Sequence, residues 1–330
     1  MRVLVTGAFG TLGRAAVRTL LADGHRVRCL DVPTRGNRRA ARRLGDRVEV
    51  AWGDVRDAVS VAAAVAGQEG VIHDAALLPP ATERTPELAR AVNVEGTRNL
   101  LRALEAEPAR PPVVFPSSIT VFGPDPTRTR PVRPGDPVRA TDRYTEHKLE
   151  AEAMLGAAAV PAVILRVAVS VDPATRSGDV EALGTLFAMD PDTRLEWIHP
   201  DDVARAQVNA LDCREAWGRV WLVAGGPSCR VRLRDLVETL FAALGLGTVP
   251  AAAFGTGAFY TDWMDTDESQ RLLAYQRHSF ADFQREMAWN MRHLRLALLP
   301  FRPLVGAWLL RQSRAWREAR ASVARAAALD

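Results

Sequence analysis

Short apolar runs alternate with helical stretches through the first two-thirds of the chain. Between the runs, apolar residues recur with helical spacing, as in Leu12, Ala16 and Leu20. Strand and helix in alternation build a parallel sheet with helices on both faces. The pattern therefore predicts an α/β fold of the Rossmann-like, doubly wound class. The expected strands are 3–6, 26–31, 48–52, 70–73, 112–116 and 162–167, and the expected helices are 11–22, 57–66, 86–105 and 143–159.

The alternation loosens beyond about residue 171. Short strands are expected at 195–199 and 219–223, and helices at 201–211 and 233–243. We predict a nucleotide-binding domain over 1–170, to which later strands near 195–223 return, and a smaller substrate-binding lobe over 171–290. The segment 127–137, rich in Pro, Arg, Thr and Gly, is expected to be a loop over the site.

The tail, 291–330, interleaves leucine and tryptophan with arginine. Apolar residues at helical spacing among basic ones predict a basic amphipathic helix. Such a helix lies on a membrane surface, or it covers the protein's own core or a dimer interface. Both interpretations stay open at this stage, and a homodimer is expected.

Composition narrows the class of protein. No run approaches the roughly 18 apolar residues that a membrane span needs, and the chain begins with a strand-like run instead of an export signal. Its three cysteines are widely spaced and odd in number, so neither a disulfide framework nor a metal site is indicated. A cytoplasmic protein is expected. The arginines are dispersed apart from 38–43 and the tail, which argues against nucleic-acid binding.

A glycine-rich loop joins the first strand to the first helix. Glycines let the backbone approach a pyrophosphate, and the helix N-terminus offers unpaired N–H groups and a positive dipole end. The loop therefore predicts a dinucleotide phosphate site. Its expected contacts are Gly7, Phe9, Gly10, Thr11, Leu12 and Gly13.

Asp31 ends the second strand, where an acid contacts the adenosine ribose hydroxyls of a dinucleotide and repels the extra phosphate of NADP. The cofactor expected is NAD. Three arginines that follow are placed to reach a 2′-phosphate and work against that preference: Arg35, Arg38 and Arg39. Asp54, with its neighbour Val55, is placed either to contact the adenine or, for Asp54, to cap the next helix.

Lys148 is the only lysine among the chain's 43 basic residues. Arginine serves wherever a basic side chain only has to be soluble, so the one lysine is a candidate for a role that needs a compact cation. Chance survival at an exposed helix position is the alternative. Lys148 lies four residues after Tyr144, on the same side of an expected helix.

Several motifs occur in one order along the chain. They are TGAFGTLG, HDAA at 73–76, Asn93 in VNVEGT, SSITVFG at 117–123, YTEHK at 144–148, Leu165-Arg166, and WIHPDDV at 197–203. In this order they resemble the extended short-chain dehydrogenase/reductases, the NAD-dependent epimerase/dehydratase group. The resemblance covers the chain to about residue 290.

The resemblance implies a site and a reaction. An alcohol must lose its hydroxyl proton as its hydride leaves for nicotinamide, so a base must reach the oxygen. Tyr144 is implied as this base, with Lys148 lowering the pKa of its phenol and holding the nicotinamide ribose. Ser118 is implied to orient the substrate oxygen, and Asn93 to support a relay water. Further implied cofactor contacts are Ala75, Ala76 and Ser117.

Departures from the family pattern bear on the reaction. Ile119 and Thr120 stand where sugar-nucleotide dehydratases place acids, and Val169 stands where many epimerases have asparagine. Three arginines remain that could bind a diphosphate: Arg176, Arg194 and Arg230. We expect an NAD-dependent dehydrogenase or reductase acting on a small molecule. A nucleotide-sugar epimerase with bound NAD and a non-catalytic NAD-binding regulator are the alternatives.

Three residues are expected to contact the substrate: Thr120, Arg166 and Trp197. Four apolar side chains are expected to line an apolar pocket or to belong to the core: Phe187, Met189, Trp197 and Trp263.

Overall fold

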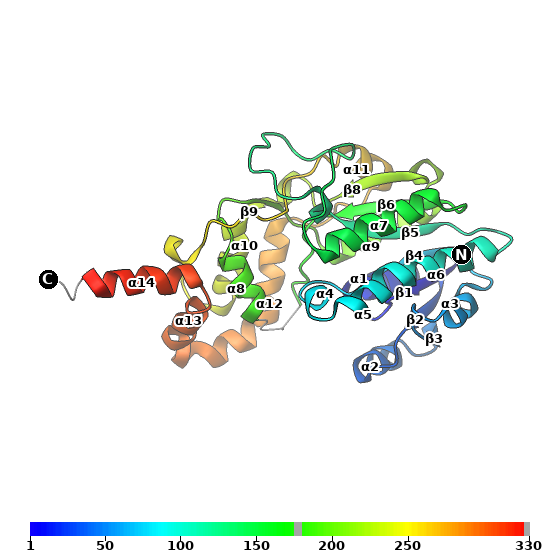
Figure 1. The fold of residues 1–330 in the computed structure, drawn as a ribbon. Coiled ribbons are helices and arrows are strands. Elements are labelled where there is room, and N and C mark those ends of the chain that lie inside the picture. The colour runs from blue at the N-terminus through cyan, green and yellow to red at the C-terminus, as the bar shows by residue number, and fades with distance from the viewer. Residues whose placement is uncertain (175–179, 327–330) are drawn as a thin grey trace.

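A computed structural model describes residues 1–174 and 180–326. Its main sheet is parallel, with the strand order β3-β2-β1-β4-β5-β6-β8 (Figure 1). The strands are β1 (Arg2–Thr6), β2 (Arg26–Asp31), β3 (Val48–Trp52), β4 (Gly70–His73), β5 (Val113–Ser118), β6 (Ala162–Val167) and β8 (Arg219–Val223). The strand order reverses between β1 and β4, the crevice where doubly wound folds bind dinucleotides. The expected Rossmann-like class is confirmed.

Helices cover both faces of this sheet. They are α1 (Thr11–Ala22), α2 (Arg35–Leu44), α3 (Ala58–Val65), α6 (Gly96–Ala106), α7 (Arg143–Ala157) and α9 (Pro200–Asp212). α1 and α9 pack together over one face, around Val3 and Val5. α3, α6 and α7 cover the other face, around Leu4. Successive residues of a strand point to opposite faces, so β1 is buried on both sides, as its unbroken apolar run predicts.

The expected helix over 86–105 is interrupted. Two short helices, α4 (Ala81–Arg84) and α5 (Pro86–Arg90), precede a π-helical turn over Ala91–Glu95, after which α6 begins. Helix α2 is not predicted by the sequence pattern, because its residues are mostly arginine, alanine and glycine and carry no apolar stripe. Thr34 caps this helix by accepting a hydrogen bond from the backbone N–H of Asn37.

The second lobe is built from a small antiparallel sheet and helices. Of the two strands expected to return to the main sheet, β8 does so, whereas the other pairs with a strand of the lobe. Its elements are β7 (Arg194–Glu196), β9 (Arg230–Arg232), α8 (Val180–Phe187), α10 (Leu233–Leu244) and α11 (Asp267–Leu273). α10 packs against α12 (Phe280–Leu298).

The tail is not one helix that starts at residue 291. α12 runs through that position, with Phe283, Met287 and Met291 buried, and is followed by α13 (Arg302–Leu310) and α14 (Arg314–Ala326). These last helices lie on the side of the second lobe that is remote from the main sheet (Figure 1). Among the described residues, no helix is both long enough and apolar enough to cross a lipid bilayer.

Candidate active site

The loop from β1 to α1 requires glycine for steric reasons. Gly7 has a φ of +62°, and a Cβ there would lie 2.7 Å from the backbone of Ala75 after β4. A Cβ on Gly13 would lie 2.2 Å from the carbonyl oxygen of Gly7. The first turn of α1 is therefore held tightly against the end of β1. Its N-cap, Gly10, has no side chain that could occupy the helix N-terminus.

A cavity of about 400 Å³ opens beside this loop at the carboxyl ends of β1, β2 and β4. Most cofactor contacts expected from the sequence line it: Gly7, Phe9, Gly10, Asp31, Asp54, Val55, Ala75 and Ala76. The other three residues of the loop, Thr11, Leu12 and Gly13, form the first turn of α1 next to it. Glycine backbone, a helix N-terminus and a carboxylate around one crevice fit a dinucleotide.

Asp31 is oriented by three hydrogen bonds. Its carboxylate accepts from the backbone N–H of Phe9 at 2.9 Å and of Val32 at 2.8 Å, and from Asn37 Nδ2 at 3.0 Å. Burial raises the pKa of Asp31, and the two backbone hydrogen bonds oppose the rise. Asn37 also lines the cavity. The sequence analysis missed it because nothing in its neighbourhood marks it as a partner of Asp31.

The three arginines near this carboxylate are exposed. Arg38 lies over the ring of Trp52, 5.3 Å from its centre, and donates to the carbonyl of Pro33. Neither Arg38 nor its neighbours Arg35 and Arg39 line the cavity. Beside Asp31 the cavity is therefore lined by its carboxylate and not by these arginines.

Asp54 lines the cavity and is paired with Arg56, whose guanidinium donates to both carboxylate oxygens. This contact lowers the pKa of Asp54. The helix-cap interpretation is wrong, because Asp57 caps α3 by accepting from the backbone N–H of Val59 and Ser60.

Tyr144 and Lys148 lie on α7, which begins with a capping box between Asp142 and Thr145. Both side chains are buried. The Tyr144 phenol is hydrogen-bonded to Ser118, at the carboxyl end of β5. Burial raises the pKa of Tyr144 to about 12, and the bond to Ser118 opposes this rise. The structure thus brings together three residues that the sequence separates by up to 30 positions.

Lys148 is 5 % exposed and donates a hydrogen bond of 2.6 Å to the carbonyl oxygen of Pro116. Its Nζ lies 4.4 Å from the centre of the Phe115 ring and 5.8 Å from that of Tyr144. Burial lowers the pKa of Lys148 to about 8, while the negative charges of Asp74 and Glu152 work in the opposite direction. The ammonium has two N–H groups left beyond the Pro116 bond.

Asp74 was not predicted as a site residue, although it directly follows the buried strand β4. Burial raises its pKa to about 7, against the effects of a hydrogen bond from Gln207 Nε2 and of the Lys148 charge. It also lines the cavity. Asp74 therefore carries a titratable group between the cofactor crevice and Lys148.

Asn93 lies in the π-helical turn and forms two hydrogen bonds with the backbone of Leu77. Its Oδ1 accepts from the Leu77 N–H at 2.7 Å, and its Nδ2 donates to the Leu77 carbonyl at 2.9 Å. His147 Nδ1 lies 3.4 Å from the same Nδ2. π-turns inside helices recur at functional sites, and this one turns the Asn93 side chain toward α7.

Tyr260, from the second lobe, reaches the start of α7. Its hydroxyl is hydrogen-bonded to Asp142, the N-cap of α7, and it is close enough to Tyr144 for the two phenols to influence each other. Burial raises the pKa of Tyr260. No sequence motif marks this residue, because it meets α7 only in the folded chain.

Three residues expected to contact cofactor or substrate form hydrogen bonds within the protein. Ser117 Oγ donates to Glu152 at 2.5 Å, and Arg166 binds both oxygens of the same carboxylate while it packs over Phe122. Arg166 and Ser117 thus connect β5, β6 and α7 inside the protein. The Thr120 hydroxyl donates to Ser118 Oγ at 2.9 Å and so lies directly beside the candidate site.

The four residues expected to line an apolar pocket do not share one environment in the structure. Trp197 is fully buried and its indole N–H bonds to the carbonyl of Val171, so its expected contact with substrate is wrong. Phe187 and Met189 also belong to the core. Trp263 lies between two arginines of the second lobe, each a little over 5 Å from its ring centre. The core interpretation, left open by the sequence, holds for the first three.

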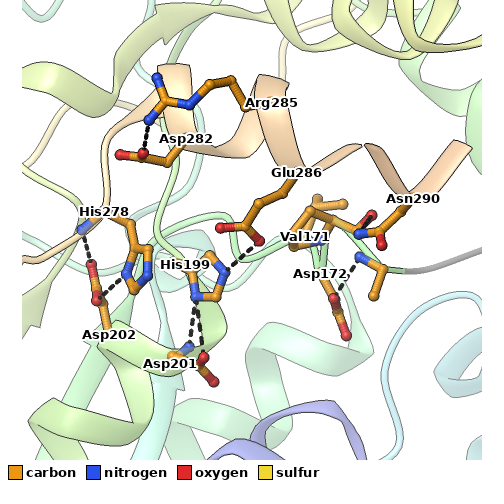
Figure 2. A network of polar contacts seen from close by, with 12 residues as sticks. Val171, Asp172, His199, Asp201, Asp202, His278, Asp282, Arg285, Glu286 and Asn290 are labelled. Atoms are coloured by element: carbon orange, nitrogen blue, oxygen red, sulfur yellow. Dashed lines mark hydrogen bonds and ion pairs between the residues drawn. The ribbon is translucent and has the colours of Figure 1, made fainter. Parts of the chain in front are cut away.

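The WIHPDDV motif joins α9 to α12 (Figure 2). His199 Nδ1 accepts from the backbone N–H of Asp201 and so caps α9, while its Nε2 lies 3.3 Å from Glu286. His278 is bonded to Asp202 at 2.7 Å and stacks on the His199 ring. Potential ligand atoms of the two histidines and Glu286 lie within 4.8 Å of one another. The two imidazole rings lie in nearly parallel planes with their centres 4.0 Å apart, so lone pairs in those planes do not converge on one ion, and we assign the cluster to packing.

The fold and the site define a Rossmann-type enzyme that uses a dinucleotide. Residues 3–224 match the family model described as "NAD dependent epimerase/dehydratase family". The chain belongs to this family, which confirms the resemblance seen in the sequence.

Relatives of different activity match parts of the chain. It is 36% identical over 163 residues to a 3 beta-hydroxysteroid dehydrogenase/Delta 5-->4-isomerase of Mycobacterium tuberculosis, over 46% of this chain and 41% of that protein. It is 34% identical over 152 residues to a UDP-glucose 4-epimerase of Corynebacterium glutamicum, over 45% and 44% of the two chains. The matches thus span less than half the length of these relatives.

Solved structures share the fold. A short-chain dehydrogenase/reductase superfamily protein from Agrobacterium tumefaciens, solved with bound NAD, superposes with a TM-score of 0.74. The superposition covers 90% of this chain and 98% of that one, at 23% sequence identity.

Proposed function

We propose that the protein is an NAD-dependent dehydrogenase that transfers a hydride between nicotinamide and a secondary alcohol or ketone of a small molecule. The observation that carries the proposal is the buried contact of Ser118 with Tyr144, with Lys148 one helical turn further along α7. These three groups supply an orienting hydrogen bond, an acid or base, and a positive charge.

The residues that would hold NAD are those along the cavity, together with Lys148 on α7. The loop from Gly7 to Gly13 would take the pyrophosphate, Asp31 the adenosine ribose, and Lys148 the nicotinamide ribose through its remaining N–H groups. When bound, NAD would supply a hydride acceptor for the alcohol, and NADH a hydride donor for the ketone.

The protein's own residues accept and donate the proton. In the direction of oxidation, Ser118 donates a hydrogen bond that orients the substrate oxygen, and Tyr144 accepts the hydroxyl proton. Burial opposes the phenolate, since it raises the pKa of Tyr144 to about 12. A positive charge on Lys148 favours the phenolate and offsets part of that effect.

The second lobe favours an uncharged substrate over a nucleotide sugar. Two of the arginines available for a diphosphate are already paired: Arg194 Nε lies 2.9 Å from Asp262, and Arg230 Nε lies 3.2 Å from the fully buried Glu196. A diphosphate would have to compete with these carboxylates. The third, Arg176, lies outside the described residues. The hydroxysteroid dehydrogenase relative also supports an uncharged alcohol as the substrate class.

A nucleotide-sugar epimerase is the second candidate, since the UDP-glucose 4-epimerase relative is nearly as similar. An epimerase keeps its NAD through each cycle, whereas a dehydrogenase exchanges it. The non-catalytic regulator is a weaker candidate, because the Ser118, Tyr144 and Lys148 side chains are all in place.

The test is to denature the purified protein, assay released NAD, and screen secondary alcohols, sterols included, and sugar nucleotides. We expect substrate-dependent NADH formation with an alcohol, and its loss in Tyr144→Phe with NAD binding retained. Tightly held NAD with turnover of a sugar nucleotide would instead establish the epimerase. An unchanged biological activity in Tyr144→Phe would support the regulator. The expected homodimer and cytoplasmic location stay predictions, which light scattering and cell fractionation test.

A further inference from the structure

An exposed apolar surface lies at the end of the chain. Among the described residues, seven of the fourteen large apolar side chains that are exposed fall within 289–308. We call this surface the tail face. Its members are Trp289, Leu294, Leu296, Leu299, Phe301, Leu304 and Trp308.

Helical spacing gathers the members on α13 into one stripe. Phe301, Leu304 and Trp308 follow one another at intervals of three and four residues, so they share one side of the helix. They are 55%, 71% and 49% exposed. An adjacent side of α13 is also apolar, but there Val305 and Leu309 pack into the core of the lobe. The exposed stripe is therefore additional to the one that folding requires.

The second half of α12 continues the surface. Met287 and Met291 face the core, whereas Trp289 and Leu296, seven residues apart, share the outer side. Exposed tryptophan and leucine at this density are unusual for a surface that meets only water.

The surroundings of the tail face are basic. Between 287 and 322 the chain has seven arginines and one acidic residue, Glu318, a formal charge of +6. The arginines are Arg292, Arg295, Arg302, Arg311, Arg314, Arg317 and Arg320. Arg314 forms the ion pair with Glu318 at 2.7 Å. Arg292 lies 3.8 Å from the centre of the Trp289 ring, which places a cation directly on an exposed apolar side chain.

We propose that the tail face docks on an anionic lipid surface. Tryptophan and leucine enter the boundary between headgroups and acyl chains, while arginines reach phosphate groups from the rim. The surface lies on α12 and α13, and α13 is remote from the main sheet (Figure 1). Docking would therefore hold the protein by its second lobe. The proposal does not depend on which alcohol, or which reaction, the active site accepts.

The test is co-sedimentation of the full chain with vesicles of phosphatidylcholine alone and with added phosphatidylglycerol. We expect binding to the anionic vesicles to be stronger by about tenfold or more, and to fall as salt is raised, because the attraction acts within a Debye length. The double variant Leu304→Asp with Trp308→Asp should lose most of it. Val59→Asp, on α3, is the matched control, since Val59 is 77% exposed and lies outside the tail face.

Two other outcomes of these measurements would contradict docking on lipid. Equal sedimentation with both vesicle types, or none, overturns the proposal even without variants. The wild type could instead fail to bind vesicles and form a dimer in light scattering. If Leu304→Asp with Trp308→Asp then converts this dimer to monomer, the tail face is assigned to a second copy of the chain. Thermal unfolding of each variant checks that the fold is kept.

Discussion

The ammonium of Lys148 donates a 2.6 Å hydrogen bond to the carbonyl oxygen of Pro116. The chain's only lysine thereby joins α7 to β5, two residues before Ser118. Its place among the Phe115 ring, the Tyr144 ring and the backbone leaves room for a compact cation.

Lys148→Arg keeps the charge but replaces a point cation with a broad planar fork. We expect turnover to fall about 10²-fold or more, the usual scale for an acid–base group that is misplaced. Steady-state kinetics measure it. Arg90→Lys is the control, because Arg90 pairs with Glu150 on the outer side of α7 and either cation can make that ion pair. Near-normal turnover in Lys148→Arg would count against the mechanism.

The protonation of Lys148 also predicts how stability depends on pH. Its pKa is lowered by burial to about 8 from the ordinary 10.5. Between these values the unfolded chain binds a proton that the folded protein lacks, so the free energy of unfolding rises with pH in this window. We expect it to rise from pH 8 to pH 10 relative to Lys148→Met, in which no charge is buried. Denaturant unfolding at each pH measures the difference. A constant or falling difference would contradict the lowered pKa.

Asp31→Asn tests the choice of cofactor. The variant keeps an oxygen that can accept from the Phe9 N–H but loses the charge that repels a 2′-phosphate. We expect the preference for NAD over NADP to fall by about tenfold, roughly 1.4 kcal/mol. Affinities for the two cofactors measure it. Asp54→Asn is the matched control in the same cavity, since Asp54 is neutralised by Arg56 and its loss should shift the preference less.

Gly13→Ala tests the tight turn of the phosphate loop. The added Cβ would lie 2.2 Å from the Gly7 carbonyl oxygen, and only backbone movement relieves that contact. We expect a loss of about 1–3 kcal/mol in the free energy of unfolding, with weaker NAD binding. Gly36→Ala, in α2, is the control. Its Cβ meets only Thr34 Oγ1 at 3.9 Å, and alanine there should stabilise the helix slightly.

The sequence by itself determined the sheet, the glycine-rich loop and the candidate site residues at the ends of its strands. Buried parallel strands are continuous apolar runs, and these runs end at Asp31, His73 and Ser118, where a doubly wound fold places its site. Tyr144 and Lys148 are four residues apart, so helical geometry alone places them on the same side of α7. Such features are local, so a short window of residues suffices to predict them.

Only the tertiary structure decided which polar groups meet across long distances. It paired Arg166 with Glu152 and buried Trp197 in the core, where the sequence suggested contacts with substrate. It placed Asp74 near Lys148 and brought Tyr260 to the start of α7. It also left one stripe of α13 exposed while the adjacent stripe packs into the lobe. Each outcome depends on how separate elements pack, and the residue types along the chain do not encode it locally.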